Sequence, residues 1–191
     1  NGLVMYPPPP FHNYAPTLAP ITLYPTPFPR EEFKRSLDIA KTYNKLYANI
    51  VSERKWLLDI VKDLSISDKD FTGKLYSCYL DAEKNGIPQD VSLALIRSDY
   101  MYDEQTRVIK QVEFNTVSVS FAGLSSKVGK LHSFLNSTGQ YSSEGTVNYY
   151  QPEDLPVSES AVGMAKGLYS GVKYYNDTYL NGENKSIVLF V

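Results

Sequence analysis

Apolar residues recur every three to four positions in five stretches of this chain, which is the spacing of one face of an α-helix. The five predicted helices begin near Pro29, Trp56, Asp68, Leu124 and Pro156. Proline and acidic residues suit the start of the first helix, while Gly86 and Gly139 are expected to end the third and fourth. The first helix carries a stripe predicted to face the core, made of Phe33, Leu37, Ala40, Tyr43, Tyr47 and Ile50.

Two stretches in the middle of the chain have the pattern of strands. Residues 91–99 are apolar on both faces until Arg97, which predicts a buried strand of a sheet covered on both sides. Residues 108–115 alternate, and this alternation predicts two distinct faces. One face is expected to hold Ile109, Gln111, Glu113 and Asn115, and the other Val108, Val112 and Phe114.

The polar residues 102–107 form a connection short enough for a hairpin, which predicts antiparallel pairing of the two strands. In that arrangement we expect Arg97 near the start of the second strand and Glu113 near its far end. A third apolar run, residues 186–191, also predicts a strand. Because no turn or cap follows it, we interpret the sequence as the N-terminal portion of a longer protein, truncated inside the sheet.

Residues 1–30 are crowded with proline, which removes a backbone donor and fixes φ. This predicts an extended arm rather than a helix or a central strand. A polyproline-type ligand for a recognition domain is the alternative. We favour packing on the chain's own body, through apolar residues of the arm: Leu18, Ile21, Leu23, Tyr24 and Phe28.

Composition excludes some classes of function. The 191 residues are 42% hydrophobic, which is enough for one globular domain with an arm. The near balance of 19 basic and 21 acidic residues argues against a nucleic-acid partner. The single cysteine, Cys78, favours a reducing compartment, and no apolar run approaches the roughly 20 residues of a membrane helix. The chain is therefore predicted to be soluble and cytoplasmic, with no membrane association.

Candidate chemistry lies at the end of the second strand and in the segment after it. Glu113 and Asn115 place a carboxylate and a carboxamide two residues apart, a pair of hard oxygen ligands that suits Mg²⁺. Ser118 and Ser120 repeat this spacing before the small residues Ala122 and Gly123, so that hydroxyl and backbone N–H groups can approach a polar ligand. The same alternation describes any half-exposed strand, and the residues alone leave both interpretations open.

Arg97 is a further candidate. An arginine at the end of an apolar strand needs an anionic partner, and the guanidinium fork fits a carboxylate bidentately. A bound substrate carboxylate would supply that partner. A structural ion pair with Asp99 or Glu104 would do so equally well.

The motif RSDYM at 97–101, followed by QVEFNTVSVSFAGL at 111–124, closely resembles the eukaryotic glutathione synthetase family. Two earlier stretches agree with this resemblance: NGLVMYP at 1–7 and ITLYPTPFPR at 21–30. The resemblance therefore covers most of the chain.

The resemblance implies an ATP-grasp ligase, in which ATP and Mg²⁺ convert a carboxylate into an acyl phosphate that an amine then attacks. The acyl donor would be γ-glutamylcysteine, the amine glycine, and the product glutathione. By motif, γ-glutamylcysteine would be held by Arg97 and the segment Val117, Ser118, Val119 and Ser120. Glu113 would bind Mg²⁺ and contact ATP, and Asn115 would complete the magnesium site. Members of this family are homodimers.

The fold implied is α/β, of the ATP-grasp type, with helices packed on a mixed sheet. Residues 1–30 would be the arm, residues 31–185 the helical and sheet part, and residues 186–191 the first strand of a substrate-binding region. The family's glycine-rich loop over the nucleotide has no counterpart in the sequence, and it is expected beyond Val191 with the remaining magnesium ligand. The chain alone is thus expected to be inactive. A non-catalytic peptide-binding or assembly module of the same fold is the alternative.

Overall fold

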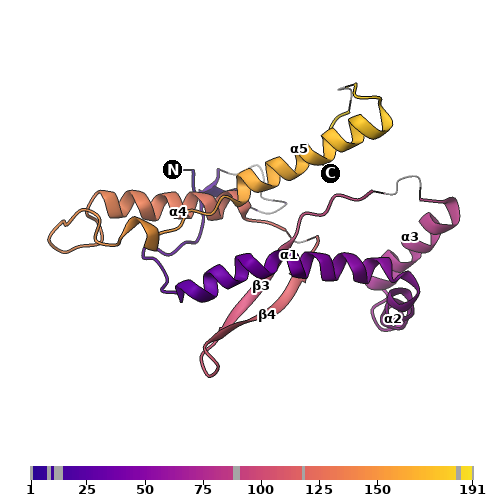
Figure 1. The fold of residues 1–191 in the computed structure, drawn as a ribbon, viewed down its shortest axis with the longest axis horizontal. Helices are drawn as coiled ribbons and strands as arrows, with labels where there is room; N and C mark the ends of the chain where they lie inside the picture. Colours follow the sequence, from indigo (N-terminus) through magenta and orange to yellow (C-terminus); the bar gives the residue numbers. More distant parts are fainter. Residues whose placement is uncertain are drawn as a thin grey trace. The chain divides into compact units, whose positions relative to one another are not determined.

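The computed structural model describes residues 2–7, 10, 15–87, 91–117, 119–183 and 186–190. The chain divides into two compact units: Pro29–Asn115 forms one, and Asn1–Phe28 with Thr116–Val191 forms the other. Over the described residues the fold is mixed α/β, with five α-helices and two antiparallel sheets of two strands each (Figure 1).

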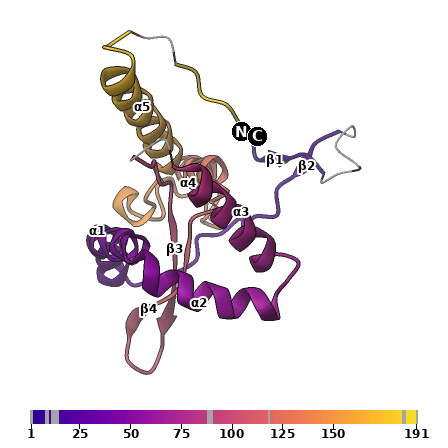
Figure 2. The ribbon, with the colours of Figure 1, turned by 90° about the vertical axis from the view of Figure 1, so that its right-hand side faces the viewer.

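Three helices open the unit Pro29–Asn115: α1 (Arg30–Ser52), α2 (Arg54–Ser67) and α3 (Thr72–Asn85). As predicted, α1 follows Pro29 and has acidic residues in its first turn. The helices α2 and α3 pack against each other (Figure 2). The predicted start at Asp68 lies four residues before α3, and the Asp68 carboxylate accepts hydrogen bonds from the Phe71 and Thr72 N–H groups at 3.3 and 3.1 Å, where α3 begins. Gly86 ends the helix at a φ of 81°, where a side chain would be strained.

The predicted hairpin is confirmed. Strands β3 (Arg97–Asp103) and β4 (Val108–Asn115) pair antiparallel around residues 104–107. The prediction that the first strand begins at Val91 was wrong, because residues 91–96 have no regular structure. Pairing sets this boundary: β4 ends opposite Arg97, and in the described part of the unit no further strand faces residues 91–96.

A β-bulge changes the predicted faces of β4. Asp99 pairs with Glu113, but the next residue, Tyr100, pairs with Gln111, so Val112 has no partner across the hairpin. An extra residue in one strand inverts the alternation beyond it. Gln111 therefore lies on the opposite face from Glu113, contrary to the prediction that Ile109, Gln111, Glu113 and Asn115 share one face.

One face of the hairpin packs on α1 (Figure 1). The Phe114 ring stacks on Tyr47 with centroids 3.6 Å apart, and Tyr100 meets Tyr43 edge to face at 6.3 Å. The prediction that one stripe of α1 faces the core was only partly correct, since Phe33 and Leu37 are exposed. The opposite face of the hairpin carries exposed Met101, so the described part of this unit does not cover the sheet on both sides as predicted.

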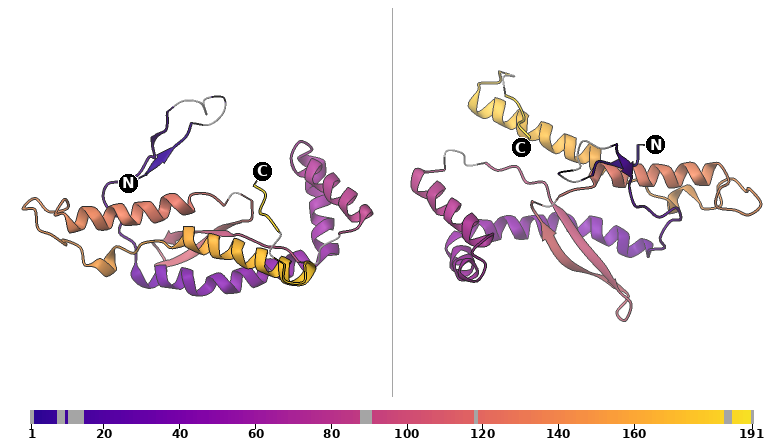
Figure 3. Two further views of the ribbon diagram at one scale, coloured as in Figure 1. Left: turned by 90° about the horizontal axis from the view of Figure 1, so that it is seen from above. Right: turned by 180° about the vertical axis from the view of Figure 1, so that it is seen from behind.

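The other unit contains β1 (Val4–Met5), β2 (Thr17–Leu18), α4 (Ala122–Ser137), the short 3₁₀ helix η2 (Pro152–Asp154) and α5 (Ser160–Tyr179). Helices α4 and α5 meet where both begin (Figure 3), with the Ser160 hydroxyl donating to Ala122 C=O at 3.0 Å. Gly129 permits close packing, because a Cβ there would lie 3.0 Å from the Val157 backbone.

The proline-rich residues pack on their own unit through unexpected side chains. Ala19 N–H donates to Leu3 C=O at 3.0 Å, and both of these residues are buried. Leu18 and Leu23, expected to pack down, are exposed. The strand expected over residues 186–191 is also not formed in the described residues 186–190, which have no regular structure and expose Ile187. A strand needs a partner for its backbone groups, and no described strand pairs with this segment. No helix among the described residues is long and apolar enough to cross a membrane.

An aromatic cluster around His132 joins α4 to the loop that follows it. His132 Nδ1 lies 2.6 Å from the Tyr141 hydroxyl, which donates to Leu23 C=O at 2.9 Å. A hydroxyl has one proton, so His132 must donate from Nδ1–H. Nearby, the buried Asn136 side chain bonds both the N–H and the C=O of Tyr150. The burial of His132 and its contact with Tyr141 fit a structural role.

The contacts of His132 lead to a prediction about pH. Burial lowers the pKa of His132, so the folded unit favours neutral imidazole. Keeping His132 neutral therefore contributes to the free energy of unfolding. The contribution is complete above the unfolded pKa near 6.5 and is lost as the pH falls from there through the lower pKa of the folded state. Hydrogen exchange of residues 140–150 in the full-length protein is expected to speed up below about pH 6.5, after correction for intrinsic rates. In His132→Asn, whose amide can replace Nδ1–H, this added pH dependence should vanish; its persistence would contradict the assignment.

Candidate functional site

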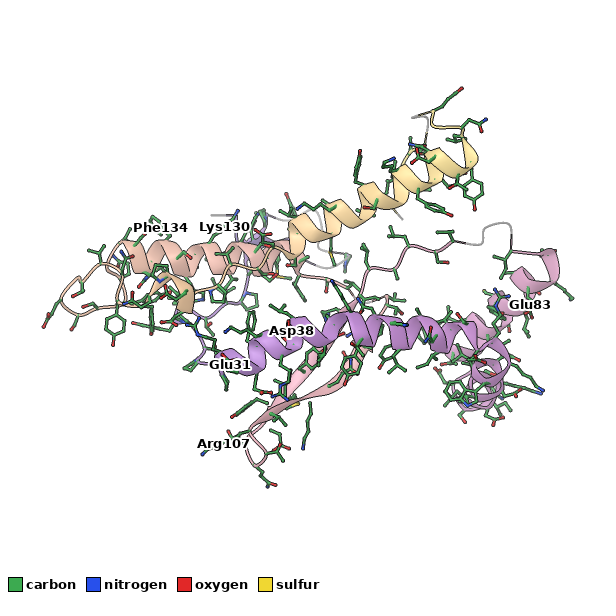
Figure 4. All side chains as sticks on the ribbon, viewed as in Figure 1. Glu31, Asp38, Glu83, Arg107, Lys130 and Phe134 are labelled. Atoms are coloured by element: carbon green, nitrogen blue, oxygen red, sulfur yellow. The ribbon has the colours of Figure 1, made fainter. Side chains whose placement is uncertain are left out.

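Four polar side chains gather on one face at the open end of the hairpin: Arg97 and Asp99 from β3, Glu113 and Asn115 from β4. The register places Arg97 opposite Asn115 and Asp99 opposite Glu113. The turn lies at the other end, where Figure 4 labels Arg107. The expectation that the hairpin separates Arg97 from Glu113 was wrong, because antiparallel pairing brings together residues equally far from the turn.

Arg97 and Asp99 form a bidentate ion pair. Arg97 Nε donates to Asp99 Oδ1 and Nη2 donates to Oδ2, both at 2.8 Å. Each side chain is about one-third exposed, at 36% and 33%. The hydrogen bonds from Arg97 lower the pKa of Asp99, and Asp99 in turn raises the pKa of Arg97. The ion pair with Asp99, one of the two structural partners predicted for Arg97, is therefore formed.

Asn115 and Glu113 complete the cluster. Asn115 Nδ2 donates to Glu113 Oε1 at 2.9 Å and to Asp99 Oδ2 at 3.3 Å. Arg97 Nη2 lies 3.6 Å from Glu113 Oε1. The two carboxylates thus share one guanidinium and one carboxamide. Glu113 is the most accessible of the three charged groups, with 55% of its side chain exposed.

The donor chemistry of this cluster fits a hard divalent cation. Carboxylate and amide oxygens are the ligands that Mg²⁺ prefers. Asn115 presents Nδ2 to Glu113, so its amide must turn before Oδ1 and the Glu113 carboxylate can hold the same ion. Within the described residues no three His, Cys, Asp or Glu side chains form a metal cluster. The hairpin by itself therefore offers only part of a metal site.

The segment after β4 belongs to the other unit. Val117 is 92% exposed, Val119 is half-buried and Ser120 is exposed, while Ser118 lies outside the described residues. Val119 N–H donates to Val117 C=O at 2.9 Å, so the chain turns tightly here. As predicted, this segment comes just before the start of a helix, α4, where N–H groups favour anions.

Two features of this region were missed by sequence reasoning. Phe121 precedes α4 with a φ of 68°, a left-handed conformation that is strained for an aromatic residue and often found at functional positions. Asp99 contacts both Arg97 and Asn115, although the sequence suggested it only as one possible ion-pair partner. The signal for Asp99 was present, since residues 97 and 99 share a strand face.

Comparisons with known proteins agree with these motifs. The model of the family described as eukaryotic glutathione synthase, ATP binding domain, matches residues 1–184. The chain is 35% identical over 192 residues to the glutathione synthetase large chain of Schizosaccharomyces pombe, covering 92% of this chain and 37% of that protein. It is 33% identical to the glutathione synthetase of Mus musculus, covering 78% of this chain and 31% of that protein. It is also 33% identical to the chloroplastic glutathione synthetase of Arabidopsis thaliana, covering 78% of this chain and 27% of that protein. The chain thus spans about a third of the length of these curated relatives.

Proposed function

We propose that this chain, which belongs to the eukaryotic glutathione synthase family, is the N-terminal part of an ATP- and Mg²⁺-dependent ligase that joins γ-glutamylcysteine to glycine. The observation that carries the proposal is the match of the ATP-binding domain model to residues 1–184. The Arg97–Asp99–Glu113–Asn115 cluster, which lies within that match, supplies chemistry suited to such an enzyme.

Arg97 and residues 117–120 are proposed to bind γ-glutamylcysteine. A guanidinium holds a carboxylate through paired charge-assisted hydrogen bonds, and the substrate carries carboxylates. The segment 117–120 comes just before α4, which begins at Ala122, and serine hydroxyls and backbone N–H groups before a helix can hold further oxygen atoms. Each set of donors would bind oxygen atoms of the substrate.

Glu113 and Asn115 are proposed to hold Mg²⁺ through their side-chain oxygens, and Glu113 also to contact ATP. Bound Mg²⁺ would neutralise the charge that develops on phosphate oxygens during phosphoryl transfer. The exposure of Glu113 supports this role, because a ligand can reach its carboxylate without unfolding the hairpin. The remaining ligands would come from the rest of the protein.

We also infer an ATP-grasp architecture and a homodimeric, cytoplasmic enzyme. Exposed, unpaired Cys78 suits a reducing compartment. The mass of the natural subunit should be well above the 21.5 kDa of this chain. Analytical ultracentrifugation of the full-length protein is expected to give twice the subunit mass, and a monomer at micromolar concentration would contradict the dimer.

The test of the function is a ligation assay on the full-length protein. Phosphate release and glutathione formation are measured while γ-glutamylcysteine, glycine, ATP or Mg²⁺ is omitted in turn. We expect product only when all four are present, and we expect chelation of Mg²⁺ to stop the reaction reversibly. A protein that binds γ-glutamylcysteine but forms no product under any of these conditions would instead be a binding module.

A further inference from the structure

Asp99 occupies the centre of the hairpin cluster. Both of its oxygens accept hydrogen bonds from Arg97 at 2.8 Å, and Oδ2 also accepts one from Asn115 Nδ2 at 3.3 Å. Its partner across the hairpin is Glu113. Asp99 is therefore placed to affect both the proposed substrate arginine and the proposed magnesium ligands.

We propose that Asp99 is a positioning residue, which keeps Arg97 oriented for the substrate carboxylate and keeps the Arg97 charge off Glu113 so that Glu113 can bind Mg²⁺. This inference rests on the proposed function. It assigns Asp99 a role in two binding events without direct contact with either ligand.

The bidentate pair with Asp99 fixes the geometry of the Arg97 guanidinium. Arg97 has five N–H donors in one plane, and Asp99 takes one from Nε and one from Nη2. Two parallel hydrogen bonds from a planar group fix both its position and the direction of its plane. A single contact would leave the guanidinium free to turn about its last side-chain bond.

Asp99 and Glu113 compete for the Arg97 guanidinium. The distance from Arg97 Nη2 is 2.8 Å to Asp99 but 3.6 Å to Glu113. If the Asp99 charge is removed, Glu113 becomes the carboxylate closest to Arg97 in the cluster. A tighter pair between Arg97 and Glu113 would then have to be broken before Mg²⁺ could bind Glu113.

The positioning role also survives the rearrangement that metal binding requires. When Asn115 turns its Oδ1 toward the ion, its Nδ2 leaves the two carboxylates. The bidentate pair of Asp99 with Arg97 does not involve Asn115 and persists through this change. Because both Asp99 oxygens accept from Arg97, Asp99 itself is not assigned as a magnesium ligand.

The experiment compares wild type and Asp99→Asn in the full-length enzyme. Residues that orient a ligand-binding group typically contribute 10- to 100-fold, so the KM for γ-glutamylcysteine is expected to rise about tenfold. The Mg²⁺ concentration that gives half-maximal rate is expected to rise several-fold. The kcat at saturating substrate and Mg²⁺ should change little, since Asp99 does not contact the reacting atoms. Calorimetry without ATP or Mg²⁺ should show about tenfold weaker binding of γ-glutamylcysteine.

Asp103→Asn is the matched control. Asp103 lies on β3, four residues from Asp99, and forms an ion pair with Lys110 near the turn. Asparagine can still accept from the N–H groups of Gln105 and Thr106 as Asp103 does. We expect wild-type KM and Mg²⁺ dependence from this variant. If Asp99→Asn lowers the melting temperature, Asp99→Glu, which keeps the charge, provides the second comparison, with a smaller rise in KM.

The outcomes separate the inference from the proposed function. Wild-type KM, Mg²⁺ dependence and affinity in a folded Asp99→Asn enzyme would overturn the positioning role and leave the ligase intact. A rise in KM without any change in Mg²⁺ dependence would overturn the competition with Glu113. Failure of the wild-type protein to ligate γ-glutamylcysteine and glycine would overturn the proposed function and, with it, the inference.

Discussion

Replacing Glu113 by alanine in the full-length enzyme is expected to lower kcat by about 1000-fold while leaving the fold intact. A metal ion at phosphate oxygens contributes several kcal/mol to transition-state stabilisation, and each 1.36 kcal/mol corresponds to a factor of ten in rate. Glu113 is the accessible carboxylate of the cluster, so its removal costs little in packing. The measurement is initial-rate kinetics at several Mg²⁺ concentrations, together with a thermal melt.

Glu104→Ala provides the control for this prediction. Glu104 is an exposed acidic residue of the same hairpin, located in the turn at the end opposite to the cluster. The Glu104→Ala variant is expected to keep the wild-type rate. This result would show that the loss of one negative charge on the hairpin does not by itself lower kcat. Glu113→Ala with a rate within tenfold of wild type at saturating Mg²⁺ would show that Glu113 is not a magnesium ligand.

Much of the scaffold was predictable because local sequence determines it. The helix that begins after Pro29 and the end of α3 at Gly86 depend on residues within one turn of the boundary. The third helix was predicted from Asp68, four residues before its observed start at Thr72. The hairpin was likewise predictable, since a short polar connection leaves antiparallel pairing as the simplest outcome.

The wrong predictions about the two strands have one physical cause: they depend on how each strand pairs with the other, which local sequence does not determine. The bulge at Val112 depends on how two strands align, and one inserted residue reverses which side chains face α1. The start of β3 at Arg97 rather than Val91 depends on where β4 ends. The roles of the candidate residues stay a prediction, and their arrangement could not be read from the sequence, because Arg97 and Asn115 are partners only in the register that the folded hairpin adopts.

For the candidate residues 117–120, the sequence could not predict the side-chain directions for a different reason. Spacing suggested that these residues present donors before a helix, and α4 does begin at Ala122. The alternation that assigned side chains to faces, however, applies only within a strand. Beyond Asn115 the chain leaves β4 and turns at Val117, so periodicity no longer says where a side chain points.

Glu32→Ala is expected to produce the largest loss of stability in the hairpin unit, about 2–3 kcal/mol. Glu32 is only 6% exposed, and its Oε2 accepts a hydrogen bond from Ile109 N–H at 2.8 Å. Its Oε1 also lies 3.1 Å from Arg35 Nη2. Alanine would leave the buried Ile109 N–H without its acceptor, and an unsatisfied buried donor retains its full desolvation cost.

Two variants separate the hydrogen bond from the charge. Glu32→Gln keeps an oxygen that can accept from Ile109 N–H and should lose no more than about 1 kcal/mol. Arg35→Ala removes the ion pair between half-exposed Arg35 and the buried Glu32 carboxylate but keeps the hydrogen bond to Ile109 N–H. Its cost should therefore exceed the roughly 1 kcal/mol of a surface pair and stay below the roughly 3–5 kcal/mol of a fully buried pair. Hydrogen exchange of residues 108–115 in the full-length protein reports local opening of β4 directly. In Glu32→Ala this exchange should accelerate about 30- to 140-fold, because 1.4 kcal/mol corresponds to a factor of ten.

The same variant tests whether α1 holds the candidate site in place. Ile109 lies on the strand that carries Glu113 and Asn115, so local opening of β4 also disturbs their alignment with Arg97 and Asp99. We therefore expect Glu32→Ala to raise the apparent KM for γ-glutamylcysteine as the inverse of the fraction of hairpin that stays closed, while Glu32→Gln keeps it near wild type. Equal exchange in Glu32→Ala and wild type would show that the contact between Glu32 and Ile109 does not anchor the hairpin.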